Sequence, residues 1–360
     1  MYKNLILPLL LRMDPEFAHN LAAFLLRTAA KIPPIRYGAC KQFTVKSSRL
    51  EQTLFGLRFW NPMGLAAGMT KSGRELLGWW MFGFGFLEMG GITKDRQAGN
   101  KGTRMFRNVP ARVLFNRMGF NNPGAYNTAL FLCRSAPLEC PLFINIGKSK
   151  SATNEKAAAD YAETFETLYQ YGDVFVLNPS SPNTPGLREL QGKVFLRGIL
   201  AAVNEVRGRM REKGLGYKKV LVKLAPDLPP EGLKNALEAV FEEGANGVVA
   251  ANTTITKLGV ECPTTEMVGM SGPPLFELSL PMVAEIHKQL PELPIIAVGG
   301  IDSGEKMYQM AKKGASLGQL FTGIVYEGFG LTSRINLELD AILKKNGETM
   351  VSLNPKVKRI

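Results

Sequence analysis

The chain has 360 residues, enough for one α/β barrel with an extension or for two smaller domains. Its composition, 45% hydrophobic and 21% charged with 37 glycines and 22 prolines, excludes collagen-like, coiled-coil and wholly disordered proteins. A net charge of +13 favours an anionic partner: nucleic acid, a phosphorylated cofactor, a small acid or an anionic membrane surface.

The positive charge is concentrated at the N-terminus, where residues 1–50 hold eight lysines and arginines, the first being Lys3, against two acids. Four cysteines without a CxxC pair and two histidines 268 residues apart predict no metal site. We expect the cysteines to be buried free thiols, with a disulfide between Cys133 and Cys140 as the alternative in an oxidising compartment.

The apolar run at residues 5–11 is too short to span a bilayer. A signal peptide is disfavoured because acids follow at once and no small-residue cleavage site precedes them. Asp14-Pro15-Glu16 instead predicts a helix start, with a side-chain cap, a proline in the first turn and an acid favoured by the helix dipole. The helix would end at Ile32-Pro33-Pro34. Its apolar stripe consists of Phe17, Leu21, Phe24, Leu25 and the methyl group of Thr28.

Two short amphipathic helices therefore make up the expected N-terminal extension, residues 1–40. The apolar stripe has two interpretations that the residues leave open. It docks on the main domain, or it lies in a membrane interface with lysines and arginines against anionic head groups.

Eight brief apolar or small-residue runs follow a hairpin-like stretch at residues 54–60, and most intervals between them have helical periodicity. Continuous apolar strands that alternate with helices predict a parallel sheet covered on both faces. Eight repeats favour closure into a (β/α)8 TIM barrel over residues 41–360. The runs occupy residues 63–68, 85–91, 142–147, 174–181, 220–226, 247–254, 295–300 and 317–323.

Polar residues and glycines gather where these runs end. Because the carboxyl ends of barrel strands face one mouth, we expect these residues to surround a single site. Gly299, Gly300 and Gly323 follow the seventh and eighth runs, where such barrels usually hold a phosphate on backbone N–H groups. This position predicts a phosphorylated cofactor.

Seven strings that contain glycines, asparagines or prolines lie in or between these runs: NPMGLAAGMTK (61–71), FNRMGFNN (115–122), FINIGK (143–148), NPSSPNTPGLR (178–188), VKLAPD (222–227), ANTT (251–254) and IIAVGGIDSG (295–304). In this order and spacing they resemble the dihydroorotate dehydrogenase family, over about residues 50–325. The N-terminal LLLRMDPEFAHNLA looks like the helical extension of the membrane-associated, quinone-linked class of this family, class 2.

The resemblance implies oxidation of (S)-dihydroorotate to orotate, with FMN as hydride acceptor and ubiquinone or menaquinone as final acceptor, in UMP biosynthesis. It implies Ser181 as the general base and Lys71 as the lysine between flavin and substrate. A serine is a weak base, so it needs a dry pocket and a relay through water and a hydroxyl such as Thr184.

The resemblance also implies three sets of binding residues. The residues expected to bind the substrate are Lys71, Asn116, Arg117, Met118, Gly119, Phe120, Asn178, Asn183, Asn252 and Thr253. The residues expected to bind FMN are Ala67, Gly68, Lys71, Gly91, Asn145, Asn178, Lys223, Ala251, Ser271, Gly272, Gly299, Gly300, Phe321, Thr322 and Gly323. The residues expected at the quinone entrance are His19, Arg104 and Arg107.

The chain departs from the family pattern at several positions. Gly91, Ala251 and Phe321 lack hydroxyls usual in the family, and Thr70 replaces an acid or amide. The segment TKDRQAGN (93–100) lacks the prolines of TPxPQPGN, and VGMSGPP (268–274) lacks a glycine and a basic residue. Each lost hydrogen bond costs about 0.5–1.5 kcal/mol, so the lost hydroxyls predict weaker FMN binding. The resemblance places the usual tyrosine at Phe321 near the quinone path, so this departure leaves the electron acceptor open.

The main hypothesis is a peripheral membrane enzyme, on the cytoplasmic face of the inner membrane if the source is bacterial. One alternative is a related FMN barrel oxidoreductase with another acceptor or pyrimidine-like substrate. The other is a flavin-binding paralogue without turnover. A nucleic-acid partner is not expected, because the chain has no recognised binding motif and no aromatic-basic platform.

Overall fold

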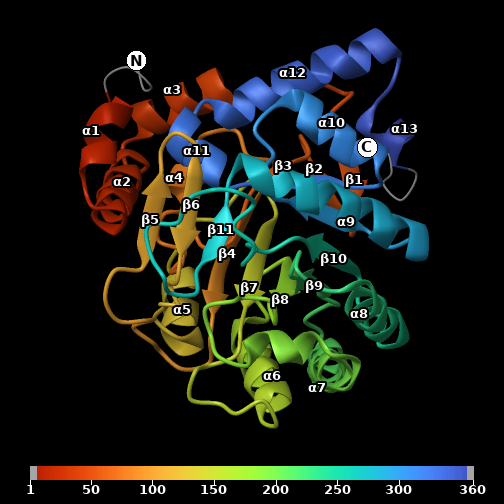
Figure 1. Ribbon diagram of the computed structural model, residues 1–360. Helices are drawn as coiled ribbons and strands as arrows, with labels where there is room; N and C mark the ends of the chain where they lie inside the picture. Colours follow the sequence, from red (N-terminus) through yellow and green to blue (C-terminus); the bar gives the residue numbers. More distant parts are fainter. Residues whose placement is uncertain (1–5, 355–360) are drawn as a thin grey trace.

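The computed structural model describes residues 6–354 (Figure 1). Its centre is a closed barrel of eight parallel strands, so the expected TIM barrel is confirmed, and each of the eight runs supplies one strand. In chain order the barrel strands are β3 (Met63–Leu65), β4 (Phe86–Ile92), β7 (Leu142–Ile146), β8 (Val174–Leu177), β9 (Lys219–Leu224), β10 (Gly247–Ala250), β12 (Ile295–Val298) and β13 (Leu317–Leu320).

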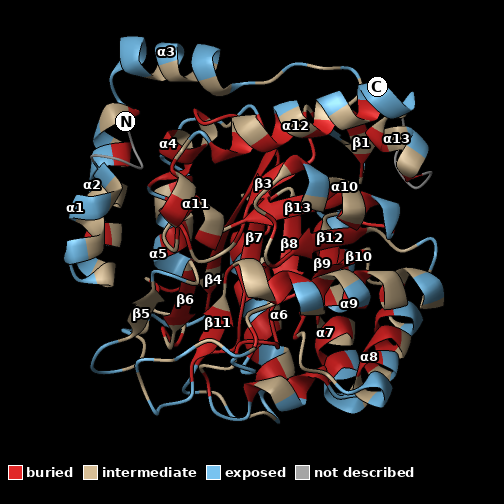
Figure 2. Ribbon diagram, turned by 45° about the horizontal axis from the view of Figure 1, so that its top comes forward, coloured by how far each residue is buried: buried red, intermediate tan, exposed pale blue. Residues whose placement is uncertain are grey.

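Helices surround the barrel and hide its outer face, as the buried strands at the centre of Figure 2 show. Each helix turns an apolar stripe inward; in the longest, Leu196, Ile199, Leu200 and Val203 are buried at i, i+3, i+4 and i+7. The helices are α4 (Leu76–Trp80), α5 (Ala125–Leu132), α6 (Ala157–Leu168), α7 (Lys193–Glu212), α8 (Pro230–Glu242), α9 (Phe276–Gln289), α10 (Gly304–Lys312), α11 (Thr322–Glu327), α12 (Leu331–Asn346) and α13 (Met350–Leu353). Two 3-10 helices, η2 (Leu187–Gln191) and η3 (Pro273–Leu275), precede α7 and α9.

The barrel interior follows the two-residue alternation of β-strands. Phe86, Phe143 and Leu221 belong to one buried apolar cluster inside the barrel. The hairpin of β1 (Gln52–Leu54) and β2 (Leu57–Phe59) closes the end away from the site, because Phe59 packs edge-on against Phe86 and Phe143 at ring distances of 5.7 and 6.3 Å.

A small antiparallel sheet lies beside the barrel mouth, in the order β11-β6-β5. Its strands are β5 (Met105–Asn108), β6 (Val113–Asn116) and β11 (Gly269–Ser271). Two of them come from the long segment between the second and third barrel strands, which brings Asn116 next to Gly269 of a distant loop.

The N-terminus forms α1 (Leu7–Arg12), α2 (Pro15–Ala29) and α3 (Pro33–Phe43) along one side of the barrel (Figure 1). The expected start of α2 is confirmed, because the Asp14 carboxylate accepts the N–H groups of Glu16 and Phe17 at 3.0 and 2.9 Å. Among the described residues no helix is long and apolar enough to cross a membrane. Lys3 and Leu5, the first residue of the apolar run, lie outside the described residues.

The third helix was not expected. Ile32-Pro33-Pro34 predicts the end of a helix, but Pro33 and Pro34 also occupy the first turn of α3, where their missing N–H groups cost nothing. The proposed boundary between residues 40 and 41 therefore falls inside α3.

All four cysteines are free thiols, and the alternative disulfide between Cys133 and Cys140 is not formed. The expected burial holds for Cys140 only. Cys133 is exposed because it follows the last turn of α5, and Cys40 and Cys262 are half-buried.

Candidate active site

A cavity at the carboxyl ends of the barrel strands gathers most of the predicted site residues. We call it the mouth cavity; about 170 Å³ of it is open to the centres of water molecules. The predicted residues that line it are His19, Ala67, Gly68, Lys71, Gly91, Asn116, Met118, Gly119, Phe120, Asn178, Ser181, Asn183, Lys223, Ala251, Asn252, Thr253, Ser271, Gly272, Gly299, Gly300, Phe321, Thr322 and Gly323.

The floor of the mouth cavity is a layer of buried polar side chains. Glu88 and Asn145 follow Phe86 and Phe143 by two residues on β4 and β7. Because side chains alternate along a strand, they also point into the barrel. Asn145 donates to the Glu88 carboxylate at 2.7 Å, and Gln319 of β13 donates to the other oxygen of Glu88 at 2.5 Å. Lys223 of β9 completes this layer.

The side chain of Lys223 is buried in the wall of the mouth cavity. Burial lowers the pKa of Lys223, and the negative charge of Glu88 opposes that shift. A buried cation beside a cavity interacts strongly with negative charge that develops there, because little water screens it.

The loop after β8 carries a network of amides and hydroxyls. Asn178 donates to Asn145 at 3.0 Å and accepts from Asn252 at 3.1 Å. Asn252 also donates to the Ser180 hydroxyl at 2.9 Å, and Ser180 donates to Asn178 at 3.0 Å. The network fixes the orientation of each amide toward the cavity.

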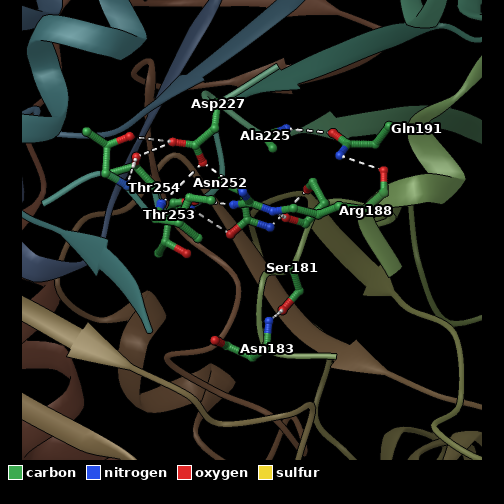
Figure 3. Close-up of polar contacts among 12 residues, drawn as sticks. Ser181, Asn183, Arg188, Gln191, Ala225, Asp227, Asn252, Thr253 and Thr254 are labelled. Atoms are coloured by element: carbon green, nitrogen blue, oxygen red, sulfur yellow. Dashed lines mark hydrogen bonds and ion pairs between the residues drawn. The ribbon is translucent and has the colours of Figure 1, made fainter. Parts of the chain in front are cut away.

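Ser181 lies in this loop, and a brace across three loops holds the loop in place (Figure 3). Arg188 donates to the Ser180 carbonyl at 3.1 Å, to the Asp227 carboxylate at 2.8 Å and to the Thr253 carbonyl at 2.9 Å. The Ser181 hydroxyl is buried and accepts the N–H of Asn183 at 3.3 Å, which leaves its own hydrogen available for another partner.

Three buried amide oxygens at the mouth cavity lack a hydrogen-bond partner among the described residues. They are Oδ1 of Asn121, Oδ1 of Asn183 and Oε1 of Gln319. The amide nitrogen of Asn183 is by contrast used, donating to Asn116 at 2.9 Å. Orphaned buried acceptors on a cavity wall are the expected state of groups that hydrogen-bond a ligand.

Lys71 and His19 lie at the side of the mouth cavity next to α2, where the charge of Lys71 acts on His19. Burial lowers the pKa of Lys71 to about 8, Glu16 raises it and Arg104 lowers it. Burial, and after it the charge of Lys71, lowers the pKa of His19 to about 4. At neutral pH this side therefore holds one ammonium group and a neutral imidazole.

Glycines border the opposite end of the mouth cavity, beyond β12 and β13. A side chain at Gly300 would clash with the backbone of Phe276 at 2.6 Å, and one at Gly272 with the carbonyl of Arg112 at 2.7 Å. The Thr322 hydroxyl donates to Ser271 at 2.8 Å. This backbone-lined end matches the usual phosphate position of such barrels.

The departures from the family pattern have local explanations in two cases. A Cβ at Gly91 would lie 2.8 Å from the Phe120 ring, so the ring occupies the space of the missing side chain. The Thr70 hydroxyl donates to the Glu75 carboxylate at 2.8 Å. Nothing in the structure explains Ala251 or Phe321.

Four predicted residues do not line the mouth cavity. Asn145 lies behind its wall, and Arg117 pairs with Glu266 at 2.5 Å. Arg104 pairs with Glu16 of α2, and Arg107 donates to the Leu10 and Met13 carbonyls at 3.0 and 3.1 Å. The two arginines thus fasten α1 and α2 to β5 rather than line the cavity.

Sequence reasoning missed Glu88, Gln319, Arg188 and Asp227. Glu88 and Gln319 interrupt otherwise apolar runs, and a polar residue inside a buried strand is a signal that could have found them. Arg188 and Asp227 end two of the quoted strings, but only the fold shows that they meet.

The sequence model of the dihydroorotate dehydrogenase family matches residues 49–343. A relative from Natronomonas pharaonis named dihydroorotate dehydrogenase (quinone) is 42% identical, covering 96% of this chain and 95% of the relative. A relative of the same name from Christiangramia forsetii is 41% identical, covering 94% of this chain and 98% of the relative.

A solved structure from Eimeria tenella, ligand-free DHODH, is also similar. It has a TM-score of 0.82 and 32% sequence identity, and the match covers 96% of this chain and 98% of that one. The match of a family model over most of the chain, together with relatives above 40% identity over nearly full length, leads to one conclusion: this chain belongs to the dihydroorotate dehydrogenase family.

Proposed function

We propose that this protein oxidises dihydroorotate to orotate, a step of pyrimidine biosynthesis, and passes the electrons to a quinone. The observation that carries the proposal is that Ser181, Lys71 and four asparagines meet at one cavity in a member of this family. The printed names of the relatives supply the quinone.

FMN fits the residues of the mouth cavity. Orphaned acceptors such as Gln319 Oε1, the buried ammonium of Lys223 and the glycine cradle of Gly272 and Gly300 suit a flat ring system with a phosphate tail. When bound, FMN supplies the acceptor for the hydride. The ring would lie against Ala67, Gly68 and Lys223, and Ser271, Gly299, Thr322 and Gly323 would hold the ribityl phosphate.

The side-chain amides would recognise the pyrimidine ring of the substrate by hydrogen bonds. Asn116, Asn178, Asn183 and Asn252 offer both donors and acceptors to its carbonyl and N–H groups, and Thr253 adds a hydroxyl. The Lys71 ammonium would pair with the substrate carboxylate. A ligand without matching groups leaves these buried amides unpaired, which gives the site its selectivity.

Ser181 would take the proton from C5 while hydride leaves C6. Its hydroxyl already accepts an N–H from Asn183, so its hydrogen can point to a water molecule or to Thr184, which is buried three residues later. That route would carry the proton away, because a serine alkoxide is not stable alone.

The visible spectrum of the purified protein tests this proposal. Dihydroorotate added without oxygen is expected to bleach the flavin bands, and Ser181→Ala is expected to slow bleaching by about 10²–10⁴-fold because general-base catalysis is lost. Flavin that stays oxidised in the wild type, or full speed in S181A, would contradict the assigned reaction.

The acceptor and the membrane are the second part of the proposal. The neutral His19, together with the helices that Arg104 and Arg107 fasten to β5, would form the approach for ubiquinone or menaquinone. The extension would hold the protein on an anionic membrane surface as a peripheral protein, on the cytoplasmic face if the source is bacterial. Steady-state rates with ubiquinone, fumarate and NAD distinguish this acceptor from the others; faster turnover with fumarate or NAD would contradict it.

A further inference from the structure

A second cavity lies beside α2 and adjoins the mouth cavity. We call it the side cavity; about 690 Å³ of it is open to the centres of water molecules. Its walls come from α2, the segment after β3, residues 96–98 and α5. His19, Lys71 and Asn121 line both cavities, so the two cavities adjoin at these side chains, and one of the three is the cation at the edge of the site.

Positive charge dominates the walls of the side cavity. Arg74, Arg96 and Arg134 line it together with Lys71, against the single carboxylate of Glu75. That carboxylate is buried and accepts the Thr70 hydroxyl at 2.8 Å. Arg96 also stands in the segment 93–100, where the chain departs from the prolines of the family pattern.

The three guanidinium groups are not neutralised. Within residues 6–354, Arg74, Arg96 and Arg134 form no ion pair with a carboxylate, and Arg74 packs over the Phe131 ring at 5.6 Å. Neighbouring arginines behave differently, since Arg104 and Arg117 each bind a glutamate. Unpaired cations around a hollow raise the local concentration of anions.

Helix α2 separates this basic cavity from an apolar surface. His19, Asn20 and Ala23 face the side cavity, whereas Phe17, Phe24 and Leu25 are exposed. At 100° per residue these two sets occupy different faces of the helix. An anion in the side cavity and a membrane surface against the exposed set would therefore contact different sides of α2.

We propose that the side cavity is the vestibule through which the anionic carboxylate substrate enters and its carboxylate product leaves. The proposal rests on the proposed function, because it takes dihydroorotate and orotate as the anions. The three arginines concentrate the anion, and Lys71 receives its carboxylate at the inner end. The neutral state of His19, whose pKa is held low by burial, keeps Lys71 the sole cation of the shared wall.

The test uses the full-length flavoprotein with R74Q, R96Q and R134Q combined. At low salt kcat/KM for dihydroorotate is expected to fall by about threefold to tenfold, and its dependence on ionic strength to flatten, because electrostatic attraction is lost. The rate at saturating substrate and the KM for quinone stay unchanged. The matched control combines R211Q, K313Q and K345Q, which remove the same charge from exposed positions on α7, directly after α10 and on α12.

Equal kcat/KM and equal salt dependence in the triple variant and the wild type would overturn the vestibule. Unchanged substrate kinetics with loss of binding to phosphatidylglycerol vesicles would assign the arginines to lipid head groups instead and also overturn it. Failure of the proposed function is recognised separately, since the wild type would then neither bind orotate nor be reduced by dihydroorotate.

Discussion

At the scale of single residues, burial decides what the charged groups of the site can do. Lys71 and Lys223 are cations in places that disfavour charge, and their pKa values are lowered for that reason. A lysine whose proton is weakly held responds to an anionic ligand by binding both the ligand and its proton more firmly. Ligand affinity therefore depends on pH.

Orotate binding is expected to weaken above pH 8. The free protein loses the Lys71 proton as pH rises through about 8, and an uncharged amine attracts the carboxylate less. Lys71→Gln is expected to weaken binding about tenfold to 100-fold below pH 8, the range of a charged hydrogen bond, and to flatten the dependence. Titration of the flavin absorbance with orotate between pH 6 and 9 measures this. K345Q on α12 is the control, and the same pH dependence in K71Q would refute the role of Lys71.

Arg188 is expected to act as a positioning residue for Ser181. Replacement by glutamine removes bonds to Ser180, Asp227 and Thr253 and frees the loop, and small misplacements cost about 10²-fold in rate. R188K should recover part of the loss, because it keeps the charge opposite Asp227. The readout is the rate of flavin reduction at saturating dihydroorotate, with flavin content as the folding control. An unchanged rate in R188Q would show that the brace is dispensable.

At the scale of elements, the burial of side chains on α2 distinguishes the two interpretations of its apolar stripe, docking on the barrel and contact with a membrane. Ala18 and Leu26 are buried, and Leu26 packs against Gly78 of α4. The predicted stripe lies elsewhere on the helix: Phe17, Phe24 and Leu25 are 59%, 52% and 55% exposed. Docking on the barrel therefore uses another face, and most of the stripe remains available to a membrane.

Replacing this exposed stripe with serines is expected to reduce binding to anionic vesicles without unfolding the protein. F17S/F24S/L25S removes side chains that gain up to about 1.5–3 kcal/mol each on full burial, so the loss should exceed tenfold. Cosedimentation with vesicles containing phosphatidylglycerol measures it. V194S/F241S/L337S changes apolar residues on α7, α8 and α12 that are at least as exposed, and this variant should bind like the wild type. Equal binding by both variants would exclude α2 as the anchor.

At the scale of the whole molecule, the extension and the barrel contribute different parts of the site. The barrel carries the layer of Glu88, Asn145 and Lys223, while α2 adds only His19 to the wall of the mouth cavity. The third helix, α3, packs on the barrel domain. The rings of Phe43 and Phe82 lie 5.1 Å apart, and the Phe43 carbonyl accepts a hydrogen bond from the Ser333 hydroxyl.

Removal of residues 1–32 is therefore expected to separate the two half-reactions. Dihydroorotate should still reduce the flavin within a few-fold of the normal rate, whereas turnover with ubiquinone should fall at least about tenfold because its approach is lost. A water-soluble dye as acceptor serves as the control and should be unaffected. Unchanged ubiquinone kinetics would show that α1 and α2 play no part in quinone access.

The sequence by itself determined the barrel, its eight strands and the side of the barrel on which the site lies. Apolar periodicity is local, and parallel strands bring their carboxyl ends together whatever the loops do. The glycines and asparagines at those ends could be assigned to one site for this reason. The start of α2 was likewise readable from Asp14 and Pro15, because a helix cap involves neighbouring residues only.

Only the tertiary structure decided which side chains reach the cavity and which support it. Asn145 lies behind Asn178, Arg188 meets Asp227, Arg104 meets Glu16, and three unpaired arginines surround one hollow. Each of these facts depends on contacts between residues far apart in the chain. Local pattern cannot encode such contacts, because they arise from the packing of loops and helices around the barrel.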